Sequence, residues 1–264
     1  MYNFFKELPK RLKNEIGGKI EEKICYVHVH KCAGTSISSA IREHYIGLDI
    51  RRDRELISID AEASTIASES KRKSAKEIYE FREKLLMYFL ELRNTRFVSG
   101  HFLFSEKIYK KFNDRFAFII GLRDPIERWL SHYFFNRYKK KKYGMIYEDF
   151  DGYLTSDMGS LNGREYIQFL CGLADKDLGT EEALECAKYN LRFFDVIGFL
   201  EYKEEFVEKF NRRFGAKLIL RQRNKNPKSE FFKDSFLSID NKNKINALCQ
   251  PDIELYKYAI EKYL

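Results

Sequence analysis

The sequence is poor in the residues that build extracellular or fibrous proteins. Its 264 residues include five cysteines, Cys25, Cys32, Cys171, Cys186 and Cys249, an odd number of widely scattered thiols. This pattern argues against a disulfide framework and favours a reducing compartment. Four prolines and 14 glycines also argue against long disordered linkers. The remaining composition, 44% hydrophobic and 33% charged, is that of an ordinary globular domain.

Long apolar runs are lacking as well. The first 20 residues hold no run near the roughly 7–15 apolar residues of a signal peptide, nor the roughly 18 of a membrane span. We therefore expect a cytoplasmic protein without a transmembrane segment. Residues 1–22 are predicted to be a helical extension that packs on the domain; a short basic helix that touches a membrane or partner is the alternative.

Positive charge is in surplus. The formal charge is +8 and the isoelectric point is near 9.0. This surplus indicates a polyanionic partner, such as a nucleotide, a nucleic acid, an acidic glycan or a membrane surface, and carries no information about the fold.

Predicted strands alternate with predicted helices along the chain. The strands are expected at 23–31, 96–102, 115–125 and 193–201. The segment "RFAFIIGLRDP" is almost continuously apolar up to its glycine, as in a strand buried on both faces of a parallel sheet. The pattern predicts one α/β domain over 1–264, with a central parallel sheet between layers of helices.

The stretch 45–95 divides into a polar part and a helical part. Within it, 51–76 is polar and is expected to be loop and helix start, and 76–94 has helical apolar spacing. Residues 252–264 are predicted to form a terminal amphipathic helix.

The segment "HKCAGTSIS" has the features of an anion-binding loop. It lies between a strand and a helix, where backbone N–H groups and the helix dipole attract negative charge. Gly34 would allow close approach, Thr35 and Ser36 would add hydroxyl donors, and Lys31 a positive charge. A plain helix cap is the alternative. In an ATP-binding loop the lysine follows the last glycine and precedes a Ser or Thr that holds Mg²⁺. Here Lys31 precedes the glycine, so this signature is absent.

A second motif, "GLRDPIERWLSHYFF", places Arg123 at the end of the strand 115–125. An arginine fork at this sheet edge can hold a phosphate bidentately, and Ser131 on the following helix can complete the shell. Asp124 is predicted to cap that helix, and Arg128 shares a face with Ser131. Ordinary ion pairs of Arg123 and Arg128 are the alternative.

Both motifs resemble those of sulfotransferases, in particular the carbohydrate family that includes uronyl and heparan sulfate 2-O-sulfotransferases. "HVHKCAGTSI" is similar to the 5′-phosphosulfate loop, with Ala33 where the family often has glycine, and "RDPIERWLSHY" to the 3′-phosphate motif. "REYIQFLCG", "FDVIGFLE", "RNKNPKS" and "DIELYKYA" are weaker matches in the family's order. The resemblance covers roughly 24–264 and implies a P-loop-like fold. It is weakest over 45–95, which is therefore predicted to be a variable insert that faces the acceptor.

The resemblance also implies the donor 3′-phosphoadenosine 5′-phosphosulfate (PAPS), the product 3′,5′-bisphosphate PAP, and no metal. The implied cofactor-binding residues are His30, Lys31, Cys32, Ala33, Gly34, Thr35, Ser36, Arg123, Ser131, Lys225 and Asn226. Lys31 would also act in catalysis, at the bridging oxygen where charge develops on the leaving group.

Five histidines compete for the role of general base. His101 follows a glycine at a strand end and corresponds to the histidine that looks catalytic in the 2-O-sulfotransferases, so it is our prediction. His30 is expected to contact nucleotide or substrate, His28 to lie in the core, and His44 and His132 to lie on helix surfaces. A zinc site made with Cys25 and Cys32 is disfavoured, because Cys25 would face away from His28 and His30.

The sequence therefore predicts a sulfotransferase that modifies a hydroxyl of a glycan or glycolipid. The basic surplus permits an acidic acceptor without requiring one. Two alternatives remain: a nucleotide-dependent phosphotransferase, which would need Mg²⁺, and a basic nucleic-acid-binding module. The second rests only on charge runs such as "KKKK", and no standard nucleic-acid motif accompanies them, so no nucleic-acid partner is expected.

Overall fold

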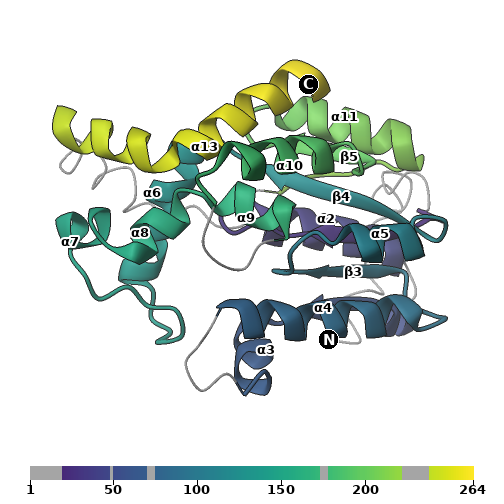
Figure 1. Ribbon diagram of the computed structural model, residues 1–264. Helices are drawn as coiled ribbons and strands as arrows, with labels where there is room; N and C mark the ends of the chain where they lie inside the picture. The colour runs from purple at the N-terminus through teal and green to yellow at the C-terminus, as the bar shows by residue number, and fades with distance from the viewer. Residues whose placement is uncertain (1–19, 48–49, 70–74, 173–177, 222–237) are drawn as a thin grey trace.

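A computed structural model describes residues 20–47, 50–69, 75–172, 178–221 and 238–264. These residues form a five-stranded sheet in the order β2-β3-β1-β4-β5, flanked by helices on both faces (Figure 1). The strands are β1 (Lys23–Val27), β2 (Leu56–Ile59), β3 (Phe97–Gly100), β4 (Phe116–Leu122) and β5 (Val196–Phe199). Every neighbouring pair is parallel. The predicted α/β class with a central parallel sheet is confirmed.

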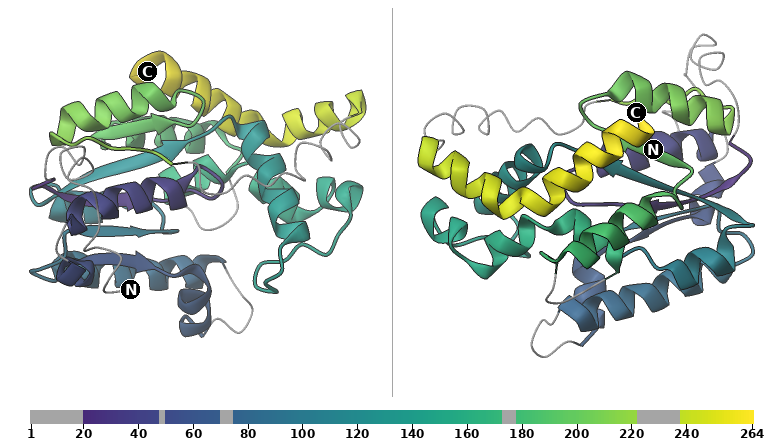
Figure 2. Two further views of the ribbon diagram at one scale, coloured as in Figure 1. Left: turned by 180° about the vertical axis from the view of Figure 1, so that it is seen from behind. Right: turned by 45° about the horizontal axis from the view of Figure 1, so that its top comes forward.

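The alternation of side chains along β1 separates the two faces of the sheet. Ile24 and Tyr26 face the helices α2 (Gly34–Ile46) and α11 (Lys203–Phe214), with which they form one apolar cluster. Cys25 and Val27 belong to the larger cluster on the opposite face. The reverse view shows α2 and α11 together over one face (Figure 2, left). Because successive strand residues point to opposite faces, one apolar strand fills two core layers.

The opposite face is covered by α4, α5, α9, α10 and part of α13. Their bounds are α4 (Ala75–Glu91), α5 (Glu106–Phe112), α9 (Glu165–Cys171), α10 (Glu181–Leu191) and α13 (Ile239–Tyr263). All five contribute buried side chains to the same apolar cluster. In Figure 1, α5 and α10 lie in front of the strands, and α13 runs along the upper border.

A third apolar cluster lies beyond the strand ends. It joins α6 (Pro125–Tyr138) and α7 (Phe150–Leu154) to the first half of α13, around the fully buried Trp129. The short helix α8 (Asp157–Asn162) lies beside α7 in both Figure 1 and Figure 2. The Trp129 indole donates to the carbonyl of Gly159 in α8 (2.8 Å). This lobe anchors α6, which carries the second phosphate motif.

The prediction that 51–76 is loop and helix start was wrong in part. The segment forms a 3₁₀ turn (Ile50–Glu55), the edge strand β2 and the helix α3 (Ala61–Ala67) before α4 begins. The strand was missed because four residues beside a charged run give little alternation to detect. Its pairing with β3, where the Ser58 and Ser99 hydroxyls lie 3.2 Å apart, is a tertiary contact.

The terminal helix is also longer than predicted. α13 begins at Ile239 and contains Pro251, which removes one backbone donor. Its added turns bury Ile245 and Cys249 against the lobe of α6 and α7. This apolar burial compensates for the backbone hydrogen bond that Pro251 cannot donate. Of the helical extension predicted over 1–22, residues 1–19 lie outside the described residues, and 20–22 are not helical; the family-like segment "RNKNPKS" also lies outside them. No helix formed by the described residues combines the length and apolar character that crossing a membrane requires.

Candidate functional site

Three chain segments that carry predicted site residues meet at one edge of the sheet. β1 lies between β3 and β4, and all three strands run parallel, so their carboxyl ends lie side by side. The segment with Lys31 follows β1, His101 follows β3, and Arg123 follows β4. Ligands of open parallel sheets bind outside the carboxyl ends of the strands. Arg123 and the glycine turn therefore lie at the same edge of the sheet.

The loop after β1 has an unusual backbone. Lys31 and Ala33 both have positive φ, 64° and 56°, a region that L-residues other than glycine seldom adopt. The left-handed Ala33 occupies the N-cap position of α2, and this helix has neither a side-chain cap nor an acidic residue in its first turn. By contrast, Asp124 caps α6 by accepting the N–H of Glu127 at 2.9 Å, as predicted from sequence. The N-terminus of α2 thus presents positive dipole charge without an internal anion.

Gly34 is required by a neighbouring ring. A Cβ at this position would lie 1.8 Å from the His28 ring, far inside van der Waals contact. His28 is half-buried, and its ring also stacks on Tyr26 at a centroid distance of 5.6 Å. Gly34 thus allows the start of α2 and the end of β1 to approach closely. His28, predicted to be a core residue, instead packs on the loop itself.

The Lys31 side chain crosses toward α6. Its Nζ lies 3.5 Å from the centre of the Phe135 ring. Burial and then the positive charge of Arg123 lower the pKa of Lys31 to about 8. This coupling of the two cations indicates that they share one site, and it makes the pair a receptor for an anion.

Tyr166 of α9 connects the two phosphate motifs. Its hydroxyl donates to the carbonyl oxygen of Arg123 (2.5 Å) and accepts the Arg123 N–H (2.8 Å). The same hydroxyl lies 3.3 Å from Sγ of Cys32 in the first loop. In the sequence, this helix is recognisable only as a weak family match. One buried hydroxyl therefore fixes the spacing between the loop after β1 and the end of β4.

Arg123 itself is a suitable anion ligand. Its side chain is 21% exposed, and its guanidinium contacts Glu127 on the next turn of α6 at 3.2 Å. Surface pairs of this kind contribute little, so a phosphate can replace Glu127 as the partner. Among the other predicted ligands, Ser131 on α6 and Ser36 on α2 are half-buried, Thr35 is exposed and Cys32 is buried. Lys225 and Asn226 lie outside the described residues.

Two family-like segments near the C-terminus, the one after β5 and α13, hold the site residues in place by hydrogen bonds. Glu201, just after β5, accepts the N–H of Asp124 (3.1 Å) and the hydroxyl of Tyr256 on α13 (2.7 Å). Asp252 on α13 is fully buried and accepts the N–H groups of Tyr166 and Ile167, at 2.9 and 3.1 Å. It therefore caps α9, the helix that carries Tyr166. Burial raises the pKa of Asp252 to about 7.

The histidines form a cluster beside this loop. The rings of His30 and His101 stack at a centroid distance of 3.7 Å with an interplanar angle of 13°, and the His28 ring lies 4.3 Å from that of His101. Burial, then the neighbouring His30 and His28, hold the pKa of His101 well below its usual range. The His101 carbonyl accepts from the buried Arg82 of α4 (2.9 Å), which places the 45–95 stretch behind this histidine.

A buried ion pair lies under the cluster and was missed from the sequence. Glu165 contacts Nδ1 of His30 with one carboxylate oxygen and Nη1 of Arg128 with the other. Arg128 is fully buried and also binds the side chain and carbonyl of Asn162. Burial would raise the pKa of Glu165, but Arg128 and His30 outweigh it and hold this pKa at about 2. The only signal in the sequence was an acid within the apolar segment "REYIQFL".

Three sequence interpretations are corrected by these contacts. Arg128 does not share an open face with Ser131, because its guanidinium is enclosed by Glu165 and Asn162. His132 is half-buried rather than fully on the helix surface: its ring lies 6.0 Å from that of His30, and burial lowers its pKa to about 3. His44 is buried on α2, and its Nε2 lies 2.7 Å from the carbonyl of Lys217.

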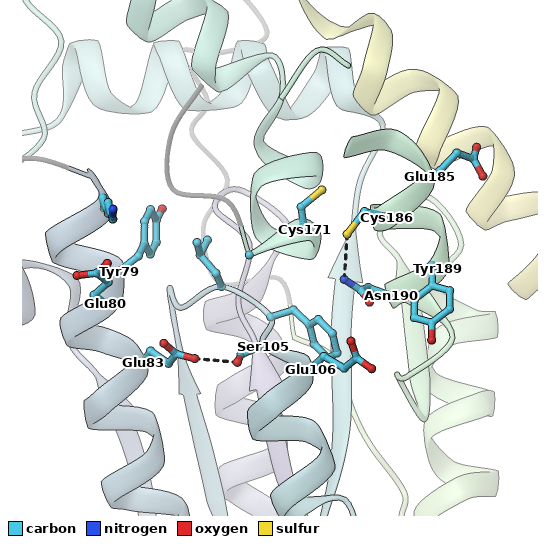
Figure 3. A pocket seen from close by; sticks show the side chains of 14 residues that line it. Tyr79, Glu80, Glu83, Ser105, Glu106, Cys171, Glu185, Cys186, Tyr189 and Asn190 are labelled. Atoms are coloured by element: carbon cyan, nitrogen blue, oxygen red, sulfur yellow. Dashed lines mark hydrogen bonds between the residues drawn. The ribbon is translucent and has the colours of Figure 1, made fainter. Parts of the chain in front are cut away.

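A cavity of about 930 Å³ lies between α4, the segment after β3, and α9–α10 (Figure 3), and none of the clustered histidines is among the residues that line it. Tyr79 on its wall contacts Phe169, whose ring packs edge-on against His30. The described lining residues include the aromatic Tyr79, Phe104 and Tyr189. Its charged residues are Lys76, Glu80, Glu83, Glu106 and Glu185, so acidic groups outnumber basic ones.

The comparisons with known proteins agree with this geometry. A sequence model of the sulfotransferase family matches residues 19–259, almost the whole chain. The chain therefore belongs to the sulfotransferase family and is a transferase enzyme. This family generally uses PAPS as donor. A search of curated proteins finds no match. Within the described part of the chain, no group of three His, Cys, Asp or Glu side chains could hold a metal ion.

Proposed function

We propose that this enzyme transfers the sulfuryl group of PAPS to a hydroxyl of a glycan or glycolipid and releases PAP. The observation that carries the proposal is the Tyr166 hydroxyl, which holds the backbone of Arg123 next to Cys32 of the loop. Two cationic segments are thereby kept together at one sheet edge. A nucleotide with separate 5′ and 3′ phosphates supplies one anion for each.

In this proposal the loop binds the 5′ end of the donor. The uncapped N-terminus of α2 would hold its oxygens, with Thr35 and Ser36 as further donors. Lys31 would stabilise the charge that develops on the leaving phosphate as the sulfur–oxygen bond breaks. Arg123, with Ser131, would bind the 3′-phosphate and so distinguish PAPS from ATP. Lys31→Ala should then reduce turnover more than affinity, and Arg123→Ala mainly affinity.

The acceptor would enter from the cavity. Its aromatic walls offer the flat apolar surfaces on which sugar rings pack, while Ser105 and Asn190 add polar groups. The acidic lining favours an acceptor that is neutral or basic where it meets the cavity, in spite of the basic surplus of the whole chain. The acceptor oxygen would attack sulfur in line, and its proton would pass to a histidine of the stacked pair, for which the sequence indicated His101.

Calorimetry with PAP against ADP tests the proposal. PAP should bind at least tenfold more tightly, and the preference should collapse in Arg123→Gln, which removes the guanidinium charge. Arg192→Gln is a matched control, because Arg192 stacks on Tyr189 away from the loop, at 3.4 Å from the ring centre. Equal affinity for PAP and ADP, or a preference that survives Arg123→Gln, would contradict the proposed donor site.

A further inference from the structure

The stacked rings of His30 and His101 have different hydrogen-bond partners. Their rings are stacked at 3.7 Å, and two imidazolium ions at this distance repel each other strongly. In both rings Nδ1 is occupied by a partner, which leaves Nε2 as the atom that can face a substrate. The charge of the partner at Nδ1 therefore distinguishes the two rings.

The partner of His30 is a carboxylate. A carboxylate that remains ionised only accepts hydrogen bonds, so Nδ1 of His30 must carry the proton and Nε2 must hold the lone pair. The same contact places the full negative charge of Glu165 directly beside the His30 ring. The second oxygen of Glu165 is held by Arg128, so the carboxylate cannot turn away from the ring.

The partner of His101 is a neutral carbonyl. Nδ1 of His101 donates to the His28 carbonyl oxygen over 2.6 Å. This contact orients the ring but supplies no full negative charge to balance an imidazolium. The guanidinium of Arg82 lies on the other side of the peptide and donates to the His101 carbonyl. His101 is thus well placed as a neutral ring against which His30 packs.

The remaining groups around His30 do not alter this balance. They come from the loop, the end of β1, α6, α9 and the segment after β3. Phe169 of α9 is apolar, and the titratable or charged groups are Lys31, Cys32, His28, His132, Arg128, His101 and Glu165. Glu165 is the one carboxylate among these described neighbours, so charge balance at the cluster depends on it.

We propose that His30 is the general base of the reaction and that Glu165, held by Arg128, is its positioning residue. This inference rests on the proposed sulfuryl transfer. In the step, the acceptor O–H bond breaks, the proton moves to Nε2 of His30, and the freed electron pair forms the new oxygen–sulfur bond. The bond between sulfur and the bridging phosphate oxygen breaks, and its electrons leave on that oxygen. His30 and Lys31 are neighbours in the segment that follows β1.

Nitrogen NMR of the wild-type protein tests the positioning. The chain has only five histidines, so single His→Gln variants assign every ring. At neutral pH, His30 should be the Nδ1–H tautomer, with a strongly deshielded Nδ1 proton, as expected for a bond to a carboxylate. An Nε2–H tautomer, or an Nδ1 proton shifted no further than that of His101, would overturn the role of Glu165.

Turnover of PAPS with water as acceptor tests the catalytic part, because water needs the same proton removal. His30→Gln should lower kcat about 10²-fold or more, the usual contribution of a general base, and His101→Gln clearly less. The reverse order would refute the inference. Glu165→Gln alone leaves Arg128 buried without a counter-charge, so the double variant Glu165→Gln/Arg128→Met is the better probe. It should keep its fold, lose the deshielded proton, and lower kcat with little change in KM.

The outcomes separate this inference from the proposed function. If PAP binds and PAPS is turned over while His101→Gln is the more damaging variant, only the assignment of His30 fails. If wild-type protein neither binds PAP nor turns over PAPS, the proposed function fails, and the base assignment fails with it.

Discussion

The lowered pKa of Lys31 makes a quantitative prediction for donor binding. With a pKa of about 8 in the free protein, the Lys31 ammonium is about one quarter protonated at pH 8.5. A bound phosphate beside Nζ favours the charged form and should return the pKa to its ordinary range, near 10.4. Binding of PAP at pH 8.5 should therefore take up about 0.75 of a proton at Lys31. At pH 7 the same process takes up only about 0.1 of a proton.

The sign follows from the cause of the shift. Burial and Arg123 disfavour the charged lysine, so its proton is lost as the pH rises through about 8. An anion reverses both effects, which gives uptake on binding and an affinity that falls with rising pH above about 8. Binding calorimetry at pH 8.5 in two buffers with different ionisation enthalpies measures the uptake directly.

Lys31→Arg is the matched control. It keeps the positive charge, and an arginine stays protonated across this range, so uptake at pH 8.5 should disappear while PAP still binds. Wild-type uptake below about 0.2 of a proton, or equal uptake in Lys31→Arg, would refute a contact between Nζ and the donor phosphate.

Three further predictions concern packing, stability and the acceptor. Gly34→Ala places a Cβ 1.8 Å from His28, so we expect a loss of about 1–3 kcal/mol in unfolding free energy and at least tenfold in PAP affinity; unchanged affinity would contradict the close approach. Asp252 is fully buried, and burial raises its pKa to about 7, so the folded protein favours the protonated carboxyl. Its contribution to the free energy of unfolding is therefore complete below about pH 4 and is lost as the pH rises through 7. In urea unfolding, the stability of wild type relative to Asp252→Asn should fall by up to about 4 kcal/mol from pH 4 to 8, and a constant difference would exclude this titration. Among oligosaccharides of equal length, those without uronate or sulfate should have the higher kcat/KM. Glu80→Gln should reduce this difference in kcat/KM between neutral and acidic acceptors. A preference for uronates that survives this change would refute an acceptor in the cavity.

Much of the architecture was readable because it is encoded locally. The strand at 115–125 is a continuous apolar run, and a strand of that kind needs helices on both faces. The loop "HKCAGTSIS" and the motif "GLRDP" each carry cations at the end of such a strand, so their meeting at one sheet edge follows from parallel pairing alone. Asp124 was recognised as a helix cap because its role involves only its own first turn.

The contacts that organise the cluster could not be read in this way. Glu165 and His30 are 135 residues apart, and Asp252 caps α9 from 86 residues further along the chain. No short-range pattern distinguishes such an acid from one on a solvated helix face. The same reason explains the misplacement of His44 and His132, whose burial depends on segments distant in sequence.

By itself, therefore, the amino-acid sequence determined the parallel α/β class, the family resemblance and the two cationic strand ends, since each depends on neighbours within one or two turns. Tertiary structure alone decided that Tyr166 joins those ends, that Arg128 is enclosed rather than open, and that a carboxylate backs His30. The physical reason is that hydrogen bonds and burial depend on distance in space, and folding brings together groups that the chain keeps far apart.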